Sequence, residues 1–255
     1  MKLRTGFLGL TLAGVVALAS ANAADMYVPG PAGYKDAPAP VQPWEGSYVG
    51  INGGFAWGAS DRLTQNETYP DTAIGASASF SPEGGFGGGQ IGHNWQRDHL
   101  VFGVEADIEG SSIGGSATVN PNSTTWAHGS SSLDWFGTVR GRLGYAFDRV
   151  LVYGTGGFAY GGVEDKLSKA DPLTGSVSDN NTATGYVVGG GLEYAVAPAW
   201  SVKAEYQYID LGKDTLSLDA VVVPKYLATL DADHAYSTVR LGVNYHILPA
   251  YEPLK

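Results

Sequence analysis

The chain contains no cysteine among its 255 residues, and only 16% of its residues are charged. The absence of cysteine excludes a disulfide scaffold, a thiolate metal site, a thiol nucleophile and a lipoprotein anchor. The formal net charge is −10, from 25 acidic and 15 basic residues. Because an acidic chain without a basic patch binds nucleic acid poorly, we expect no nucleic-acid partner.

Long apolar runs are also scarce, and the first one is short. Lys2 and Arg4 precede an apolar run over residues 6–19, and the A-x-A sequence of residues 21–23 is a cleavage site. These features predict a cleaved secretory signal peptide over residues 1–23. No later segment holds the roughly 18 uncharged apolar residues that a spanning helix needs. Such an exported chain can cross a bilayer only as a closed β-barrel, which satisfies every backbone group internally.

Glycine and aromatic residues are abundant, with 37 Gly, 15 Tyr and 6 Trp. This composition favours a close-packed sheet with two different faces over a helical protein. Residues 24–43 hold five prolines and predict a Pro-rich periplasmic linker. From Trp44 onward the sequence predicts eight strands, each about as long as a tilted membrane-crossing strand: 46–57, 84–95, 100–112, 131–145, 150–161, 183–195, 200–211 and 235–247.

The connections between these strands alternate in length. Three are tight turns of four residues, Gln96–His99, Ala146–Arg149 and Val196–Ala199. The other four are long and polar: Gly58–Glu83, Ile113–Ser130, Gly162–Thr182 and Gly212–His234. Short periplasmic turns and long external loops on an even strand count are typical of outer-membrane barrels.

We therefore predict an all-β fold: an eight-stranded antiparallel up-and-down transmembrane β-barrel over residues 44–247, with short periplasmic turns and four long extracellular loops. Residues 248–255 would form a C-terminal periplasmic tail. A soluble eight-stranded barrel of the lipocalin type is the structural alternative. It would turn its apolar alternation inward and would not need four long loops at one end.

Side chains alternate between the two faces of a strand, which assigns residues to the wall or to the interior. In 131–145 one face carries Leu133, Trp135, Val139, Leu143 and Tyr145, and the other carries Asp134, Thr138, Arg140 and Arg142. The strand 150–161 is apolar on both faces, so its phase stays open. The aromatic residues predicted at the two membrane interfaces are Trp57, Trp135, Tyr145, Trp200, Tyr206, Tyr208 and Tyr245.

Nine charged side chains are predicted to face the interior: Glu105, Asp107, Glu109, Arg140, Arg142, Glu193, Lys203, Glu205 and Arg240. An eight-stranded barrel is just wide enough for side chains to fill. Charges there must pair, because an unpaired buried charge costs several kcal/mol. The set can be a structural ion-pair network or a gate whose pairs exchange partners to open a narrow water path. The sequence does not separate these two interpretations.

Several motifs together resemble a known family. They are W-E-G-S-Y-V-G at residues 44–50, N-G-G at 52–54, V-R-G-R-L-G-Y at 139–145 and K-A-E-Y at 203–206. In these the chain resembles the small outer-membrane β-barrel proteins of Gram-negative bacteria. Within them it is most similar to the alphaproteobacterial porin-family or immunogenic outer-membrane proteins, related in fold to the OmpA transmembrane domain. Family members usually end at an aromatic residue, whereas here eight residues follow Ile247.

The resemblance implies localisation in the outer membrane and roles in envelope integrity and surface interaction. The implied partners are outer-membrane lipid and lipopolysaccharide, the barrel-insertion machinery and a host or environmental surface ligand, which is haemin in some members. A narrow passive pore for small solutes is the alternative function. A third function, lipid A hydrolysis, rests on the His-x-Ser pair His128 and Ser130, which lacks a carboxylate placed to orient the histidine.

We expect no enzymatic activity and no cofactor. The sequence G-x-G-x-x-G at residues 87–92 has no following helix, so it does not predict a dinucleotide site. The five histidines (93, 99, 128, 234 and 246) show no spacing typical of metal ligands, which predicts no metal site.

Overall fold

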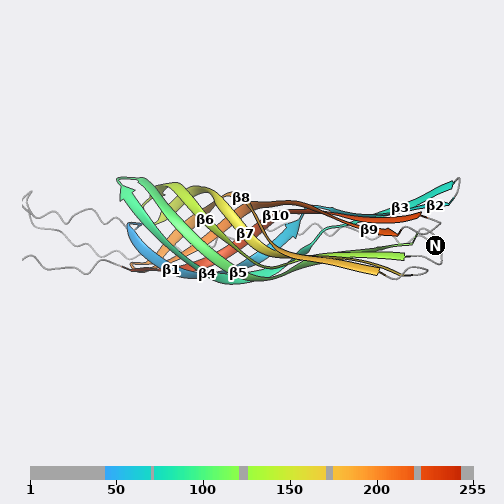
Figure 1. Cartoon of the computed structure of the whole chain (residues 1–255). Helices are drawn as coiled ribbons and strands as arrows, with labels where there is room; N and C mark the ends of the chain where they lie inside the picture. The colour runs from blue at the N-terminus through green and yellow to red at the C-terminus, as the bar shows by residue number, and fades with distance from the viewer. Residues whose placement is uncertain (1–43, 70–71, 121–125, 171–174, 221–224, 248–255) are drawn as a thin grey trace, which may run out of the picture. The chain divides into compact units, whose positions relative to one another are not determined.

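The computed structural model describes residues 44–69, 72–120, 126–170, 175–220 and 225–247. The segments assigned above to a signal peptide, a linker and a tail lie outside this part of the chain. Among the described residues, no helix is long and apolar enough to cross a membrane. The elements are the strands β1 (Gly46–Gly58), β2 (Asp61–Tyr69), β3 (Thr72–Phe80), β4 (Glu83–Arg97), β5 (Leu100–Val119), β6 (Trp126–Phe147), β7 (Val150–Ala170), β8 (Gly175–Ala197), β9 (Trp200–Ala220) and β10 (Lys225–Ile247) (Figure 1).

Eight of these strands form a closed antiparallel ring. Its order is β1-β4-β5-β6-β7-β8-β9-β10, and β10 pairs back onto β1. The closing register runs from Ser47 opposite Ile247 to Gly58 opposite Tyr236. Closure leaves no unpaired edge along the ring, as a sheet within a bilayer requires. The predicted eight-stranded antiparallel barrel is confirmed.

The prediction that the four long connections are loops is wrong, because most of their described residues belong to strands. β5 runs on to Val119 and β6 begins at Trp126, and Gly58–Glu83 contains the additional hairpin of β2 and β3. The polar runs carry aliphatic side chains at alternate positions, such as Ala228, Leu230 and Ala232 in β10, and these are buried. Burial of one face stabilises a strand even when its other face is polar.

Beyond the ring, these strand continuations form a second structure that we call the distal extension. The β8–β9 pairing ends at Tyr186 opposite Asp210, whereas β7 and β8 stay paired up to Lys169 opposite Gly175. One sheet is therefore β5-β6-β7-β8 and the other is β9-β10-β2-β3. Between them lies an apolar cluster of Leu63, Val119, Ala127, Leu167, Leu216, Ala228 and Leu230.

The opposite end of the ring, here called the turn end, has tighter turns than predicted. The strands leave only two residues between them, Asp98-His99, Asp148-Arg149 and Pro198-Ala199. Asp98 and Asp148 adopt left-handed φ values of 54° and 50°. Aspartate tolerates this conformation better than most side chains do. The predicted turn positions are confirmed, but each turn is two residues shorter because its first two residues belong to the preceding strand.

A β-bulge in β6 changes the predicted phase of that strand. The register with β5 and β7 shifts at Leu133, and Asp134 has no partner on β7. Leu133 is consequently buried while Asp134 and Trp135 are both exposed. The prediction that placed Leu133 on the outer face and Asp134 on the inner face is wrong, because the inserted residue reverses the alternation.

The phase of the fifth predicted strand, left open above, is now defined. In β7, Leu151 and Tyr153 are buried in the interior, and Val152 is exposed on the wall. Both faces of the strand are apolar because Leu151 and Tyr153 belong to an internal apolar cluster at the turn end.

Candidate functional site

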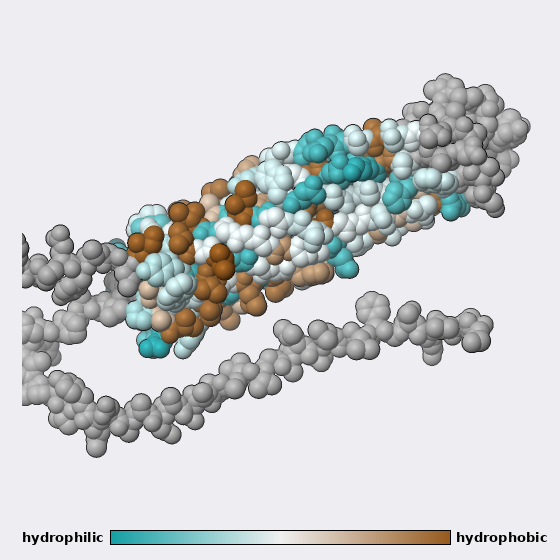
Figure 2. Space-filling view, turned by 90° about the horizontal axis from the view of Figure 1, so that it is seen from below, coloured by the Kyte–Doolittle hydropathy of each residue, from teal (hydrophilic) through white to brown (hydrophobic). Residues whose placement is uncertain are grey.

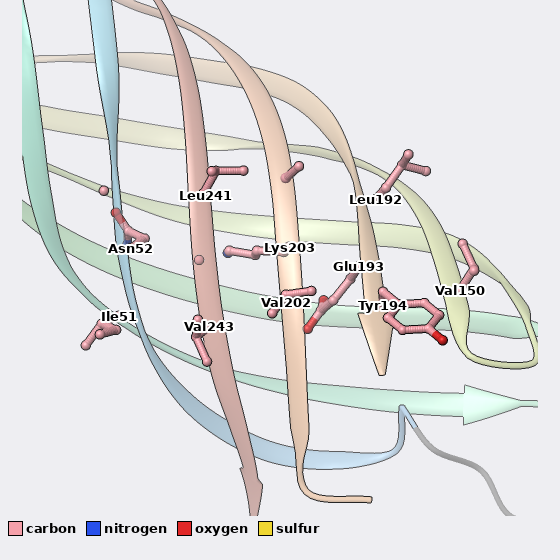
Figure 3. A pocket seen from close by; sticks show the side chains of 13 residues that line it. Ile51, Asn52, Val150, Leu192, Glu193, Tyr194, Val202, Lys203, Leu241 and Val243 are labelled. Carbon is pink, nitrogen blue, oxygen red and sulfur yellow. The ribbon is translucent and has the colours of Figure 1, made fainter. Parts of the chain in front are cut away.

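The outer wall of the ring is apolar. Figure 2 shows hydrophobic side chains gathered toward one end of the molecule and hydrophilic ones toward the other. Large apolar residues on this wall are exposed, and Ile51, Leu143, Leu192 and Leu241 are each 55–70% exposed. A pocket of about 870 Å³ is lined mostly by apolar residues such as Ile51, Val202 and Leu241, together with Asn52, Glu193 and Lys203 (Figure 3). Such a wall is unstable in water and matches the hydrocarbon region of a bilayer.

The predicted interface aromatics lie in two groups on this wall. Tyr145, Trp200 and Tyr245 are exposed near the turn end, where Trp200 and Tyr245 pack with ring centroids 5.1 Å apart. Near the other end the rings of Trp57 and Tyr206 lie 6.5 Å apart. Trp135 is also exposed there, and Tyr208 is half-buried. The prediction missed Trp95, Tyr186 and Tyr194, which alternate with inward residues in the same way and are exposed as well.

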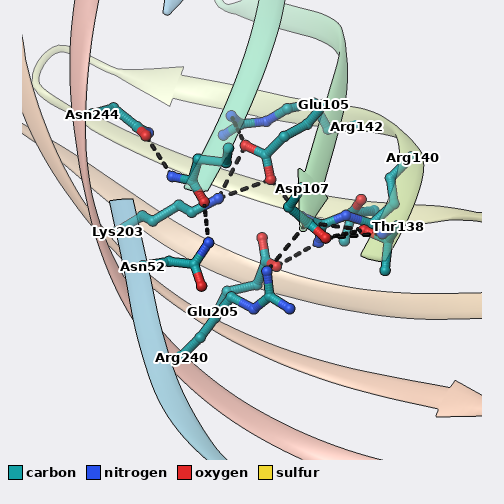
Figure 4. Close-up of polar contacts among 12 residues, drawn as sticks. Asn52, Glu105, Asp107, Thr138, Arg140, Arg142, Lys203, Glu205, Arg240 and Asn244 are labelled. Carbon is teal, nitrogen blue, oxygen red and sulfur yellow. Dashed lines mark hydrogen bonds and ion pairs between the residues drawn. The ribbon is translucent and has the colours of Figure 1, made fainter. Parts of the chain in front are cut away.

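All nine charged residues assigned to the interior are buried inside the ring, and we call them the lumen network (Figure 4). Arg140 is its centre. It donates from Nη2 to Asp107 Oδ2 at 2.6 Å and from Nη1 to Glu205 Oε1 at 2.5 Å, and Nη2 also pairs with Glu105. One guanidinium thus joins carboxylates from β5 and β9, across the lumen.

Two further cations complete the layer toward the turn end. Arg142 Nη2 lies 2.7 Å from Glu193 Oε2. Lys203 Nζ donates to Glu105 Oε1 and Oε2 at 2.8 and 3.0 Å. Glu193 also accepts hydrogen bonds from Ser201 at 2.5 Å and from Asn244 at 2.7 Å. Each of these carboxylates therefore has several donors, as a buried charge requires.

Arg240 pairs with two carboxylates of the layer. Its Nη1 lies 3.0 Å from Glu109 Oε1 and 3.2 Å from Asp107 Oδ2, and its Nη2 donates to Gln207 at 2.8 Å. Asp107 also accepts hydrogen bonds from the Thr138 hydroxyl at 2.8 and 2.9 Å. The network contains five carboxylates and four cations, so its formal charges almost balance.

Two tyrosines that the sequence analysis did not assign belong to this network. Tyr48 donates to Glu105 Oε2 at 2.6 Å, and Tyr153 donates to Glu205 Oε2 at 2.6 Å. Tyr48 lies across Gly92, where a Cβ would come within 2.3 Å of its ring. Gly191 leaves space for Tyr153 in the same way, because a Cβ there would come within 2.9 Å of the Tyr153 hydroxyl oxygen. The alternation that identified Glu105 also places Tyr48 inward, but the sequence analysis assigned only charged side chains to the interior.

Apolar layers close the lumen network on both sides. At the turn end, Trp44 is fully buried with Val101, Ala146, Leu151 and Tyr153. Gly46, the first residue of β1, has a φ of +115°, a conformation in which a side chain would be strained. Toward the distal extension, a second cluster fills the lumen with Ala56, Phe86, Ile113, Leu133, Phe136, Ala159, Val163, Val187, Ile209, Leu211 and Tyr236.

The His-x-Ser pair lies on the outer face of β6. His128 and Ser130 are both half-buried. The Nδ1 atom of His128 lies 2.9 Å from the Thr118 hydroxyl. This is the nitrogen that an orienting carboxylate would have to hold in a hydrolytic triad.

A closed antiparallel ring with an apolar wall, aromatic residues at both margins and paired charges inside defines a transmembrane β-barrel. The family model described as "Outer membrane protein beta-barrel domain" matches residues 5–246. The chain belongs to this outer-membrane β-barrel family, and its location is the outer membrane.

Relatives of known name support the same assignment. The 31 kDa outer-membrane immunogenic protein of Brucella melitensis is 37% identical over 230 residues, which cover 89% of this chain and 93% of that protein. The 22 kDa outer membrane protein of Rhizobium leguminosarum is 31% identical and covers 80% of each chain. Among solved structures, the outer membrane protein OprG from Pseudomonas aeruginosa is 14% identical and covers 79% of this chain and 97% of its own, with a TM-score of 0.43.

Proposed function

We propose that the protein is a non-enzymatic structural barrel that is embedded in outer-membrane lipid and presents the distal extension at the cell surface. The observation that carries this proposal is the filling of the ring. A layer of paired charges lies between two apolar layers, and Arg140, with no exposed side-chain surface, lies at its centre. Filling of this kind stabilises the barrel and opposes passage of water and solutes.

The distal extension supports the surface-interaction part of the proposal. It is built from strands with its own apolar core, so it is a folded surface structure held by the barrel wall. β3 is the last strand of its sheet and β8 is unpaired with β9 before Tyr186, so the extension has strand edges at which another chain can pair. Binding of haemin or of a host ligand, and recognition of β10 by the insertion machinery, stay predictions from the family resemblance.

Single cysteines test the surface presentation, because the native chain has none. We expect a membrane-impermeant maleimide to label Ser217→Cys, an exposed position of the distal extension, on intact cells. Arg149→Cys, exposed in a turn at the other end, is expected to react only after the cells are lysed. Labelling of Arg149→Cys and protection of Ser217→Cys on intact cells would reverse the orientation and overturn the proposal.

A further inference from the structure

A second buried polar cluster lies in the distal extension, apart from the lumen network. It consists of Asp61 on β2, Asp165 on β7, Asp214 on β9 and His234 on β10. Asp61, Asp165 and His234 are each at most 2% exposed, and Asp214 is half-buried. The residues on either side of Asp165 on its face of β7, Val163 and Leu167, belong to the two apolar clusters. Carboxylates in such surroundings need a compensating charge.

The three closest groups have the spacing of metal ligands. His234 Nε2 lies 3.1 Å from Asp165 Oδ2 and 3.5 Å from Asp214 Oδ2, and all three atoms lie within 4.8 Å of one another. A tetrahedral ion with bonds of about 2.0–2.2 Å separates its ligand atoms by about 3.3–3.6 Å. The two separations from His234 Nε2 are close to this range, and the two carboxylate oxygens, within 4.8 Å of each other, can close on one ion.

Several atoms of the cluster lack hydrogen bonds. Within the described part of the chain, four buried atoms at this site have no hydrogen-bond partner: His234 Nδ1, Asp165 Oδ1, Asp61 Oδ2 and the Tyr236 hydroxyl. The other oxygen of Asp61 accepts from the Asp233 backbone N–H at 2.9 Å. Buried polar atoms are nearly always paired, so this group of orphans indicates a missing ligand.

A local irregularity of the backbone brings the third ligand into place. Lys213 pairs with Asp233 and Asp210 pairs with Ala235, so Leu211 and Gly212 together oppose His234. Gly212 adopts a φ of +96°, which favours glycine. Ile209 and Leu211 face inward before this bulge and Asp214 faces inward after it. Without the extra residue, the regular alternation would turn Lys213 inward in place of Asp214.

We propose that Asp165, Asp214 and His234 bind one divalent transition-metal ion, for which Zn²⁺ is the probe. An imidazole with carboxylates suits Zn²⁺ better than Ca²⁺, which takes oxygen ligands. Asp214 is 39% exposed in its side chain and gives the ion access from solvent. β7 belongs to one sheet of the distal extension and β9 and β10 to the other, so the ion joins the two sheets.

Equilibrium dialysis of the detergent-solubilised full chain against Zn²⁺, after removal of metal with a chelator, tests this proposal. We expect one ion per chain, and an affinity weakened about tenfold or more by Asp214→Asn or His234→Gln. Co²⁺ in place of Zn²⁺ is expected to give the visible absorption of a tetrahedral complex. Asp231→Asn is the matched control, because Asp231 is exposed on the same strand as His234. This variant should bind Zn²⁺ with the same affinity as the native chain.

The two variants keep the test decisive if one of them fails to fold. Asp214 is half-buried, so Asp214→Asn leaves the core of the extension intact even where His234→Gln does not. The proposal is wrong if the chain does not bind Zn²⁺, or if Asp214→Asn leaves the binding unchanged. The cluster would then be only an ion pair between His234 and Asp165. Neither outcome affects the proposed role of the barrel as a surface anchor.

Discussion

Replacement of Arg140 by methionine is expected to destabilise the barrel by about 3–5 kcal/mol, the usual cost of removing one partner from a buried ion pair. Arg140 pairs with Glu105, Asp107 and Glu205, and its side chain has no exposed surface. In the variant, Glu105 keeps Lys203 and Arg142 and Asp107 keeps Arg240, whereas Glu205 loses its ion-pair partner. Urea unfolding of the refolded barrel in micelles, followed by circular dichroism, measures the change.

Lys166→Met is the matched control for Arg140→Met. Lys166 also forms an ion pair, 2.8 Å from Glu164, but its side chain is 56% exposed. Exposed pairs contribute less than about 1 kcal/mol because water and salt screen them. Arg140→Lys should fall between the two variants, because an ammonium keeps the charge but lacks the planar fork that reaches several carboxylates. Equal losses for Arg140→Met and Lys166→Met would show that the network does not stabilise the barrel.

Introduction of an arginine at Leu241 is expected to cost about 2–4 kcal/mol, as a cation near the middle of the lipid-facing wall does. Leu241 lies halfway along the ring portion of β10 and is 65% exposed. Its neighbours in the register are the small residues Gly53 and Ala204, so the new side chain has space and the cost comes from lipid contact. The free energy of unfolding in bilayers of defined composition provides the measurement.

Ser217→Arg adds the same charge to an exposed position of the distal extension and should change the stability by less than about 0.5 kcal/mol. A soluble barrel would respond differently, because an exposed leucine can be replaced by arginine in water at little cost. If Leu241→Arg is as stable as Ser217→Arg, the apolar wall does not face lipid.

The sequence predicted the ring well, because a ring strand has one apolar and one polar face. Alternation identified eight strands, their turns and the inward charges such as Arg140 and Glu205. It failed for the distal extension, where residues rich in Ser, Thr, Asn and Asp indicated loops. Buried aliphatic residues such as Ala228 and Leu230 alternate with polar ones there, but this alternation is too weak to outweigh the polar composition.

The remaining errors come from features that depend on tertiary structure. The bulge at Asp134 reverses the phase of β6, and no local pattern marks it. The apolar layers in the lumen include Leu151 and Phe136, which alternation alone cannot tell from wall residues. The proposed metal ligands Asp165, Asp214 and His234 come from three strands, so their spacing in the sequence carries no signal, and the expectation of no metal site rested on that spacing.

Solute flux through proteoliposomes tests the sealed barrel most directly. Vesicles containing the refolded full chain are swollen in a small sugar, beside protein-free vesicles and vesicles containing a general porin. The filled lumen predicts swelling no faster than that of protein-free vesicles. Swelling that approaches the porin rate, and that falls when Arg140 or Glu205 is replaced, would show a conducting lumen and contradict the sealed structural barrel.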